Sequence, residues 1–325
     1  MKRGLVVLDH NEIPEAQWRQ RIEQVRAQLV AEEVEVALVY GDVFRSDDIA
    51  YLTNLCIYWN EGMLAIPADG DPALLTKLSP RVHTWMRRTS TLTDLRSGKA
   101  FGTLVAELVA GREPGTLGLV DASLWPTALI DEVSAAAPGW VVRPLEGLVR
   151  QFRIRPSEEE KALLRQASVA LAKAAEEATG AGLSRQERIS VAERVVRDAG
   201  FTDVLVRATD TSVEITGQHR NSWLRIAREV EQGTLAAALR NVLAAVADGV
   251  TTGSLAEATD AQVRVVHHAD LSTDGEYASH SPSRQLAAGD VVVVSVGSPE
   301  STAADTVVIT ESGVENLTGK EVVGS

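Results

Sequence analysis

The sequence predicts two domains, an α/β N-terminal domain over residues 1–152 and an α+β C-terminal domain over residues 153–325. In the first half, short apolar segments alternate with segments of helical periodicity, which is the pattern of an α/β domain. In the second half, helical segments come first and a β-rich tail closes the chain. A length of 325 residues also favours two hydrophobic cores over one.

The first predicted element is a helix that begins after Pro14, because Trp18, Ile22, Val25 and Leu29 recur at helical spacing. Short apolar runs bounded by turn residues then predict five strands. These strands cover residues 34–40, 48–55, 62–67, 73–77 and 116–120. A second helix is predicted over residues 126–137.

The C-terminal domain opens with a clear helix start. Ser157 is a favourable cap, and the glutamates that follow it suit the positive end of the helix dipole. This helix is predicted to run to about Thr179, and a second helix begins after Ser184, where Glu187 completes a capping box. The remaining predicted elements are a helix over residues 234–247 and strands over residues 203–207, 212–216, 291–294 and 306–310.

Composition excludes several classes of function. The net charge is −13, so a nucleic-acid partner is not expected, because phosphate binding needs a basic patch. No segment has the run of apolar residues that a membrane span needs, so no membrane association is expected. Cys56 is the single cysteine, which excludes an internal disulfide and fits the reducing conditions of the cytoplasm.

The tail carries the most specific signal. From Leu286 to Thr318 it reads LAAGDVVVVSVGSPESTAADTVVITESGVENLT, and it resembles the end of the creatinase, Xaa-Pro aminopeptidase and methionine aminopeptidase family. The segments RIRPSEE at residues 153–159 and YLTN at residues 51–54 are similar to the linker and the N-terminal domain of that family. The resemblance implies a creatinase-like N-terminal domain, a shortened pita-bread C-terminal domain and a homodimer.

In that family two aspartates, a histidine and two glutamates hold a pair of metal ions, which share a water for hydrolysis. The resemblance places these five positions on Glu214, Arg225, Thr273, Ser295 and Ala304. One carboxylate remains, and an arginine stands where a cation would bind. The sequence therefore predicts neither a metal pair nor another cofactor. A metal site of another kind stays open, because six possible donors lie close together in the sequence. They are His267, His268, Asp270, Asp274, Glu276 and His280.

Creatinase itself hydrolyses a C–N bond without a metal, using a histidine as general acid and base. The resemblance therefore implies a metal-independent hydrolase, or a binder, of a small amino-acid-like or guanidino/amide molecule. The candidate catalytic residues are Glu214, His219 and His280. The candidate substrate-binding residues are Arg225, Arg228, Glu276, Tyr58, Trp59 and Arg45.

Two other functions stay open. The chain can be a catalytically silent pseudo-peptidase that acts as a binding or assembly protein, with Glu214 in a cross-strand salt bridge to Arg225 or Arg228. Tyr58 and Trp59 can equally pack against a helix of their own domain. An active metallo-aminopeptidase or dipeptidase is the third possibility, and the missing ligands disfavour it.

Overall fold

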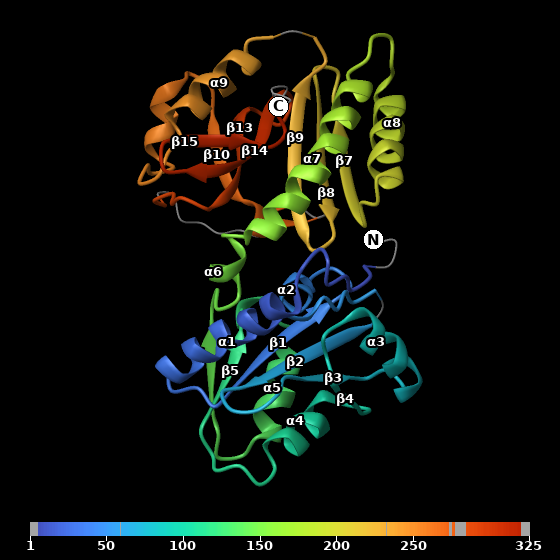
Figure 1. Ribbon diagram of the computed structural model, residues 1–325, viewed down its shortest axis with the longest axis vertical. Helices are drawn as coiled ribbons and strands as arrows, with labels where there is room; N and C mark the ends of the chain where they lie inside the picture. Colours follow the sequence, from blue (N-terminus) through green and yellow to red (C-terminus); the bar gives the residue numbers. More distant parts are fainter. Residues whose placement is uncertain (1–5, 59, 232, 273–274, 277–283, 320–325) are drawn as a thin grey trace. The chain divides into compact units, whose positions relative to one another are not determined.

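The structure, a computed structural model, describes the chain apart from residues 1–5, 59, 232, 273–274, 277–283 and 320–325. Contacts between residues divide it into two units, Leu5–Arg153 and Ile154–Ser325, which are called here the N-terminal and the C-terminal domain. Figure 1 shows both units and labels most of their helices and strands. Within the described ranges, no helix combines the length and the apolar character needed to cross a bilayer.

The N-terminal domain is built on a sheet whose described strands follow the order β4-β3-β2-β1-β5-β6. The strands are β1 (Val36–Asp42), β2 (Glu61–Pro67), β3 (Ala73–Thr76), β4 (Asp94–Ser97), β5 (Thr116–Val120) and β6 (Val141–Leu145). Strand β2 runs antiparallel to both of its neighbours, and the other neighbouring strands are parallel. The sequence prediction missed β4 and β6, the two short strands at the edges.

Helices cover both faces of this sheet (Figure 1). They are α1 (Glu15–Ala31), α2 (Asp47–Thr53) and α3 (His83–Thr89) on one face, and α4 (Phe101–Val109) and α5 (Thr127–Ala136) on the other. Successive residues of β1 alternate between the two cores: Ala37 and Val39 pack with the first helix layer, and Val36 and Leu38 with the second. Burial on both faces explains why the strands appear in the sequence as continuous apolar runs.

The strand predicted over residues 48–55 is wrong, because this segment forms helix α2. Two acids, Asp47 and Asp48, stand in its first turn, where they suit the helix dipole. Ile49 and Leu52 are fully buried, and they lie three residues apart, as on one face of a helix. Asn54 ends the helix with a left-handed backbone at φ 64°.

The described strands of the C-terminal domain form one sheet in the order β10-β13-β14-β9-β8-β7, with β15 paired to β14. They are β7 (Asp203–Ala208), β8 (Ser212–His219), β9 (Ser222–Glu229), β10 (Val263–His267), β13 (Val291–Gly297), β14 (Thr302–Thr310) and β15 (Gly313–Asn316). A separate ribbon pairs β11 (Leu271–Ser272) with β12 (Gly275–Glu276). Each of these pairings is antiparallel.

Helices α7 (Glu158–Ala178), α8 (Arg185–Asp198) and α9 (Leu235–Ala245) accompany this sheet. Both predicted N-terminal caps are present, because Ser157 Oγ accepts a hydrogen bond from the backbone of Glu160, and Ser184 Oγ accepts one from Glu187. Helices α7 and α8 pack on one part of the sheet and α9 on another. The short helices are α6 (Arg150–Arg153) and the 3-10 turns η1 (Pro80–Val82), η2 (Ala122–Leu124), η3 (Ser254–Ala258) and η4 (His268–Asp270).

The start of the C-terminal domain is fastened to strand β13. Arg155 Nε donates a hydrogen bond of 2.6 Å to Asp290 Oδ1, and the Asp290 side chain is almost completely buried. The backbone N–H of Val291 donates to the carbonyl oxygen of Ile154 at 3.1 Å. The first residues of this domain and the strand near its end are therefore joined directly.

Candidate functional site

The four described positions among the five that the resemblance assigns to metal ligands meet on neighbouring strands. In the β8–β9 pair, Glu214 lies opposite Ala227, and Arg225 lies opposite Thr216. Ala304 of β14 pairs with Ala227 as well, and so joins the same group. The sheet register therefore brings together residues from three segments of the chain.

Side-chain direction separates this group from the helix layer. Ile215 of β8 and Leu224 and Ile226 of β9 pack against α7 and α8. Because successive side chains of a strand point to opposite faces, Glu214 and Arg225 lie on the other face. This face of β8 and β9 is called here the site face.

Glu214 is the one carboxylate at these five positions, and its surroundings are positively charged. Its Oε1 atom lies 3.7 Å from Arg207 Nη1 and 3.9 Å from Arg225 Nε. Both distances are too long for a hydrogen bond. The Oε1 atom is buried and accepts no hydrogen bond from any residue that the structure describes. Glu214 therefore offers an acceptor for an N–H or O–H group.

Arg225 is held firmly on the site face. Its side chain is 5% exposed, and Nε donates a hydrogen bond of 2.8 Å to Thr216 Oγ1. Its backbone N–H donates to Thr306 Oγ1 at 2.9 Å, and the same hydroxyl donates to the Arg225 carbonyl oxygen at 2.7 Å. The guanidinium thus carries a fixed positive charge where the resemblance expects an aspartate.

An apolar group, called here the site cluster, lies against the same strands. Its buried members are Trp223, Ala227, Leu271, Val293 and Ala304. Each of them is at most 1% exposed. A dinuclear centre needs several hard oxygen donors, and the described side chains around Glu214 on this face are the Arg225 guanidinium, the Thr216 hydroxyl and the apolar site cluster. The described residues at this site do not fit a pair of divalent cations.

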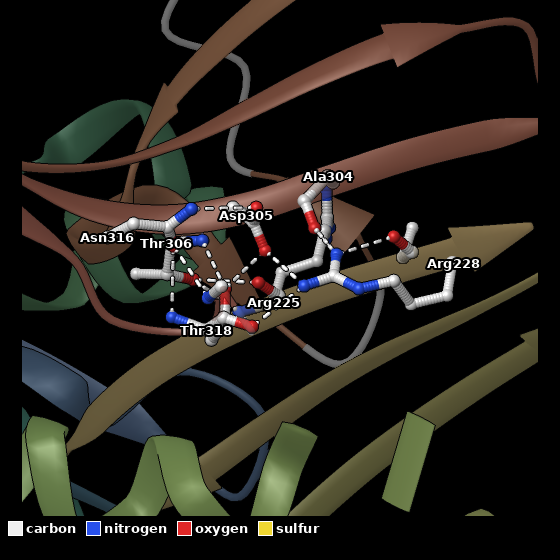
Figure 2. Close-up of polar contacts among 9 residues, drawn as sticks. Arg225, Arg228, Ala304, Asp305, Thr306, Asn316 and Thr318 are labelled. Atoms are coloured by element: carbon white, nitrogen blue, oxygen red, sulfur yellow. Dashed lines mark hydrogen bonds and ion pairs between the residues drawn. The ribbon is translucent and has the colours of Figure 1, made fainter. Parts of the chain in front are cut away.

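Arg228 faces a different set of partners, shown in Figure 2. Its Nη2 atom donates to Asp305 Oδ1 at 2.6 Å and to the Thr318 carbonyl oxygen at 2.7 Å. Its Nη1 atom donates to the carbonyl oxygen of Ala304 at 2.9 Å. Asp305 also accepts hydrogen bonds from Asn316 Nδ2 and Thr318 Oγ1, at 2.9 and 2.8 Å. These contacts, called here the tail cluster, fasten the end of the chain to β9.

His219 lies apart from Glu214, at the end of β8. Its ring centre is 5.3 Å from that of Phe201, which belongs to the core that packs on α7 and α8. Burial, followed by the nearby charge of Arg220, lowers the pKa of His219 to about 4. Its Nδ1 atom is buried and has no hydrogen-bond partner among the described residues. The structure does not bring His219 and Glu214 together on one face.

The segment after β10 is described in part. His267, His268 and Asp270 are buried, at 5, 5 and 2% exposure, at the end of β10 and in η4. Glu276 lies in strand β12. No group of three or more possible metal-binding side chains occurs in the described part of the chain. Four candidates from the sequence lie outside the described residues, namely Trp59, Thr273, Asp274 and His280.

The other two candidates belong to the N-terminal domain. The Tyr58 hydroxyl accepts a hydrogen bond of 2.8 Å from the Val6 backbone, and its ring meets that of Trp85 edge-on at 6.1 Å. Tyr58 thus packs against helix α3 of its own domain, and it also lines a small, mostly apolar cavity of about 20 Å³. The Arg45 backbone N–H donates to Asp42 Oδ1 at 2.8 Å in the turn after β1.

Sequence reasoning missed the site cluster. Trp223 and Ala227 each lie two residues from Arg225 on β9, so all three share one face. This period-two pattern was visible in the sequence. The contact of these residues with Leu271, Val293 and Ala304 was not, because it depends on how distant segments meet.

Comparison with known proteins identifies similarity in the N-terminal domain and in the fold of the whole chain. Residues 21–155 match the family model of the creatinase/prolidase N-terminal domain. No curated protein sequence matches the chain significantly.

Solved structures match almost the whole chain. The prolidase of Pyrococcus horikoshii OT3 has a TM-score of 0.73 and 15% identity, with 93% of this chain and 99% of the prolidase covered. The Xaa-Pro dipeptidase of Bacillus anthracis has a TM-score of 0.75 and 16% identity, with 93% and 98% covered. Proline aminopeptidase P II of Yersinia pestis has a TM-score of 0.67 and 15% identity, with 94% and 97% covered. The predicted fold class, creatinase-like α/β followed by a pita-bread domain, is confirmed.

Proposed function

We propose that the chain binds a small molecule at Glu214, on the β8 part of the site face, without a metal pair. The match of residues 21–155 to the creatinase/prolidase N-terminal domain model and the prolidase-like fold of the chain support this proposal. The ligand is amino-acid-like or carries a guanidino or amide group. Glu214 anchors it. Hydrolysis of a C–N bond in this ligand would need a general base, and His280 is the candidate.

The observation that carries this proposal is the buried Oε1 atom of Glu214. A carboxylate oxygen out of contact with water is stable when donors surround it. Arg207 and Arg225 lie near this atom without hydrogen bonding to it. An ammonium, amide or guanidino N–H of a ligand would supply the missing donor, as a charge-assisted hydrogen bond. The two arginines favour a ligand that carries a carboxylate as well.

A catalytically silent binding or assembly protein is the second candidate. The site cluster favours it, because buried apolar side chains occupy the face on which the family's chemistry takes place. The position of His219 beside Phe201 favours it too, since that imidazole lies on the helix side of β8. Under this proposal Glu214 and Arg225 form a structural ion pair.

A cytoplasmic location and a homodimer are part of the proposal. The homodimer rests on the resemblance, and light scattering coupled to size-exclusion chromatography tests it. A mass of twice the 34.9 kDa chain is expected. A single-chain mass at micromolar concentration would contradict it.

The absence of a metal pair is tested on protein expressed in medium supplemented with manganese, zinc and cobalt. Elemental analysis is expected to find far less than one metal ion per chain, and chelation is expected to leave the thermal midpoint unchanged. Two tightly held ions per chain, or cleavage of an Xaa-Pro dipeptide that the chelator abolishes, would contradict the proposal.

Ligand binding is tested by calorimetric titration with creatine, small amides and amino acids. Glu214→Gln is expected to weaken the binding of any ligand found by about tenfold or more, because it removes the charge that strengthens the hydrogen bond. Glu311→Gln, at an exposed turn residue of the same domain, is the matched control. Equal affinity of the two variants would exclude Glu214 as the anchor.

A further inference from the structure

We infer that the part of this face formed by β9, β13 and β14, beside Glu214, has become part of the hydrophobic core of the C-terminal domain, with Trp223 as its largest member. Restoring the missing carboxylates would then unfold this region instead of rebuilding a metal centre. The inference rests on the proposed absence of a metal pair, and goes beyond it by assigning a structural role to the residues that replaced the ligands.

The positions next to the former ligand positions are apolar on the same face. Along β9, Arg225 lies between Trp223 and Ala227 on this face, and both of these are in the site cluster. Along β13, Val293 lies two residues before Ser295 and belongs to the cluster as well. Apolar residues thus occupy the positions that surround the ligand positions on this face.

The low exposure of these side chains shows that they are packed closely on this face of the sheet. Leu271, Val293, Ala227 and Ala304 have 0% exposure, and Trp223 has 1%. Among the described residues, Trp223 heads the largest side chains that are almost fully buried. Protein interiors are packed as densely as organic crystals, so such a cluster has little room for longer side chains.

Ala304 is the position at which a longer, charged side chain is expected to be most destabilising. It stands where the resemblance expects a glutamate, and its backbone pairs with Ser295 on one side and Ala227 on the other. A glutamate there would bring a charge into an apolar cluster, where charges are costly unless they are paired. The nearest strands offer Ala227 and Ser295 rather than further carboxylates.

The test compares Ala304→Glu with Thr310→Glu, a control at the partly exposed end of the same strand. Ala304→Glu is expected to lower the folding equilibrium constant by about 100-fold or more, with or without manganese or zinc, because the carboxylate is buried. Thr310→Glu is expected to change it by less than about threefold. An Ala304→Glu protein that is as stable as the control, or that these metals stabilise, would overturn the inference.

Two further variants keep the test decisive if Ala304→Glu does not fold. Trp223→Phe keeps an aromatic ring but leaves a void, and is expected to lower the folding constant by about tenfold or more. The triple variant Arg225→Asp, Ser295→Glu, Ala304→Glu is expected to bind no manganese in equilibrium dialysis. Metal binding by the triple variant would overturn the inference, whereas stoichiometric metal in the unaltered protein would overturn the proposed function.

Discussion

Arg225 and Arg228 lie three residues apart on β9, yet their surroundings differ in kind. Arg228 donates short hydrogen bonds to Asp305 and to three carbonyl oxygens, those of Ala227, Ala304 and Thr318, so these contacts satisfy its charge. Arg225 approaches Glu214 at 3.9 Å, and the Glu214 Oε1 atom accepts no hydrogen bond from a described residue. The difference indicates that the tail cluster stabilises the fold, and it supports the ligand-binding role proposed for Glu214.

The largest expected loss of stability comes from a substitution that breaks the tail cluster. Asp305→Ala would leave the Arg228 guanidinium without its carboxylate, and would also remove the acceptor for Asn316 and Thr318. Breaking one side of such a buried pair is expected to lower the free energy of unfolding by about 3 kcal/mol. Urea denaturation monitors this, with Glu311→Ala as the exposed control. A loss below about 1 kcal/mol would mean that the tail cluster is not a stabilising unit.

An intermediate effect concerns His219, on the helix side of the same pair of strands. Its pKa of about 4 in the folded protein lies below the 6.5 of an unperturbed histidine. The unfolded chain therefore binds the proton more tightly, and stability falls as the pH drops below about 6.5. The free energy of unfolding is expected to fall by about 2 kcal/mol between pH 7 and pH 5 through this group.

His219→Phe, followed by urea denaturation at several pH values, isolates this contribution. The variant is expected to lose that part of the pH dependence and to keep the rest. An unchanged slope between pH 7 and pH 5 would mean that His219 already holds its proton at the higher pKa of an exposed imidazole.

The smallest expected loss of stability gives the clearest contrast between the ion pairs of Arg225 and Arg228. Glu214→Gln keeps the shape of the side chain and removes a charge that makes no hydrogen bond through Oε1 to the described residues. It is expected to change the free energy of unfolding by less than about 1 kcal/mol. If Glu214→Gln instead destabilises the protein as much as Asp305→Ala, the ion pair between Glu214 and Arg225 is structural. That result would favour the catalytically silent binding or assembly protein.

Local features of the fold could be predicted from the sequence because they depend on neighbouring residues. The capping boxes at Ser157 and Ser184 each involve a partner three residues away, and both are present. The strand prediction for residues 48–55 was wrong because a short apolar run is compatible with a strand and with a buried helix.

Resemblance assigned residues to the ligand positions, but it did not predict how the side chains around those positions pack. Arg225 and Ala304 could be placed at ligand positions by resemblance. The role of Arg228 could not, because its partner Thr318 lies 90 residues further along the chain. The packing of Trp223 depends on contacts among four strands, β9, β11, β13 and β14, and no local sequence pattern predicts those contacts.

The hydrogen bond between Arg155 and Asp290 has a consequence for how the chain folds during synthesis. It joins residues 135 positions apart, so the C-terminal domain cannot close until nearly all of it has left the ribosome. The N-terminal domain ends at Arg153 and can fold earlier, as a unit. Contacts between distant residues form slowly. Refolding is therefore expected in two kinetic phases, with the closure of the C-terminal domain as the slower one.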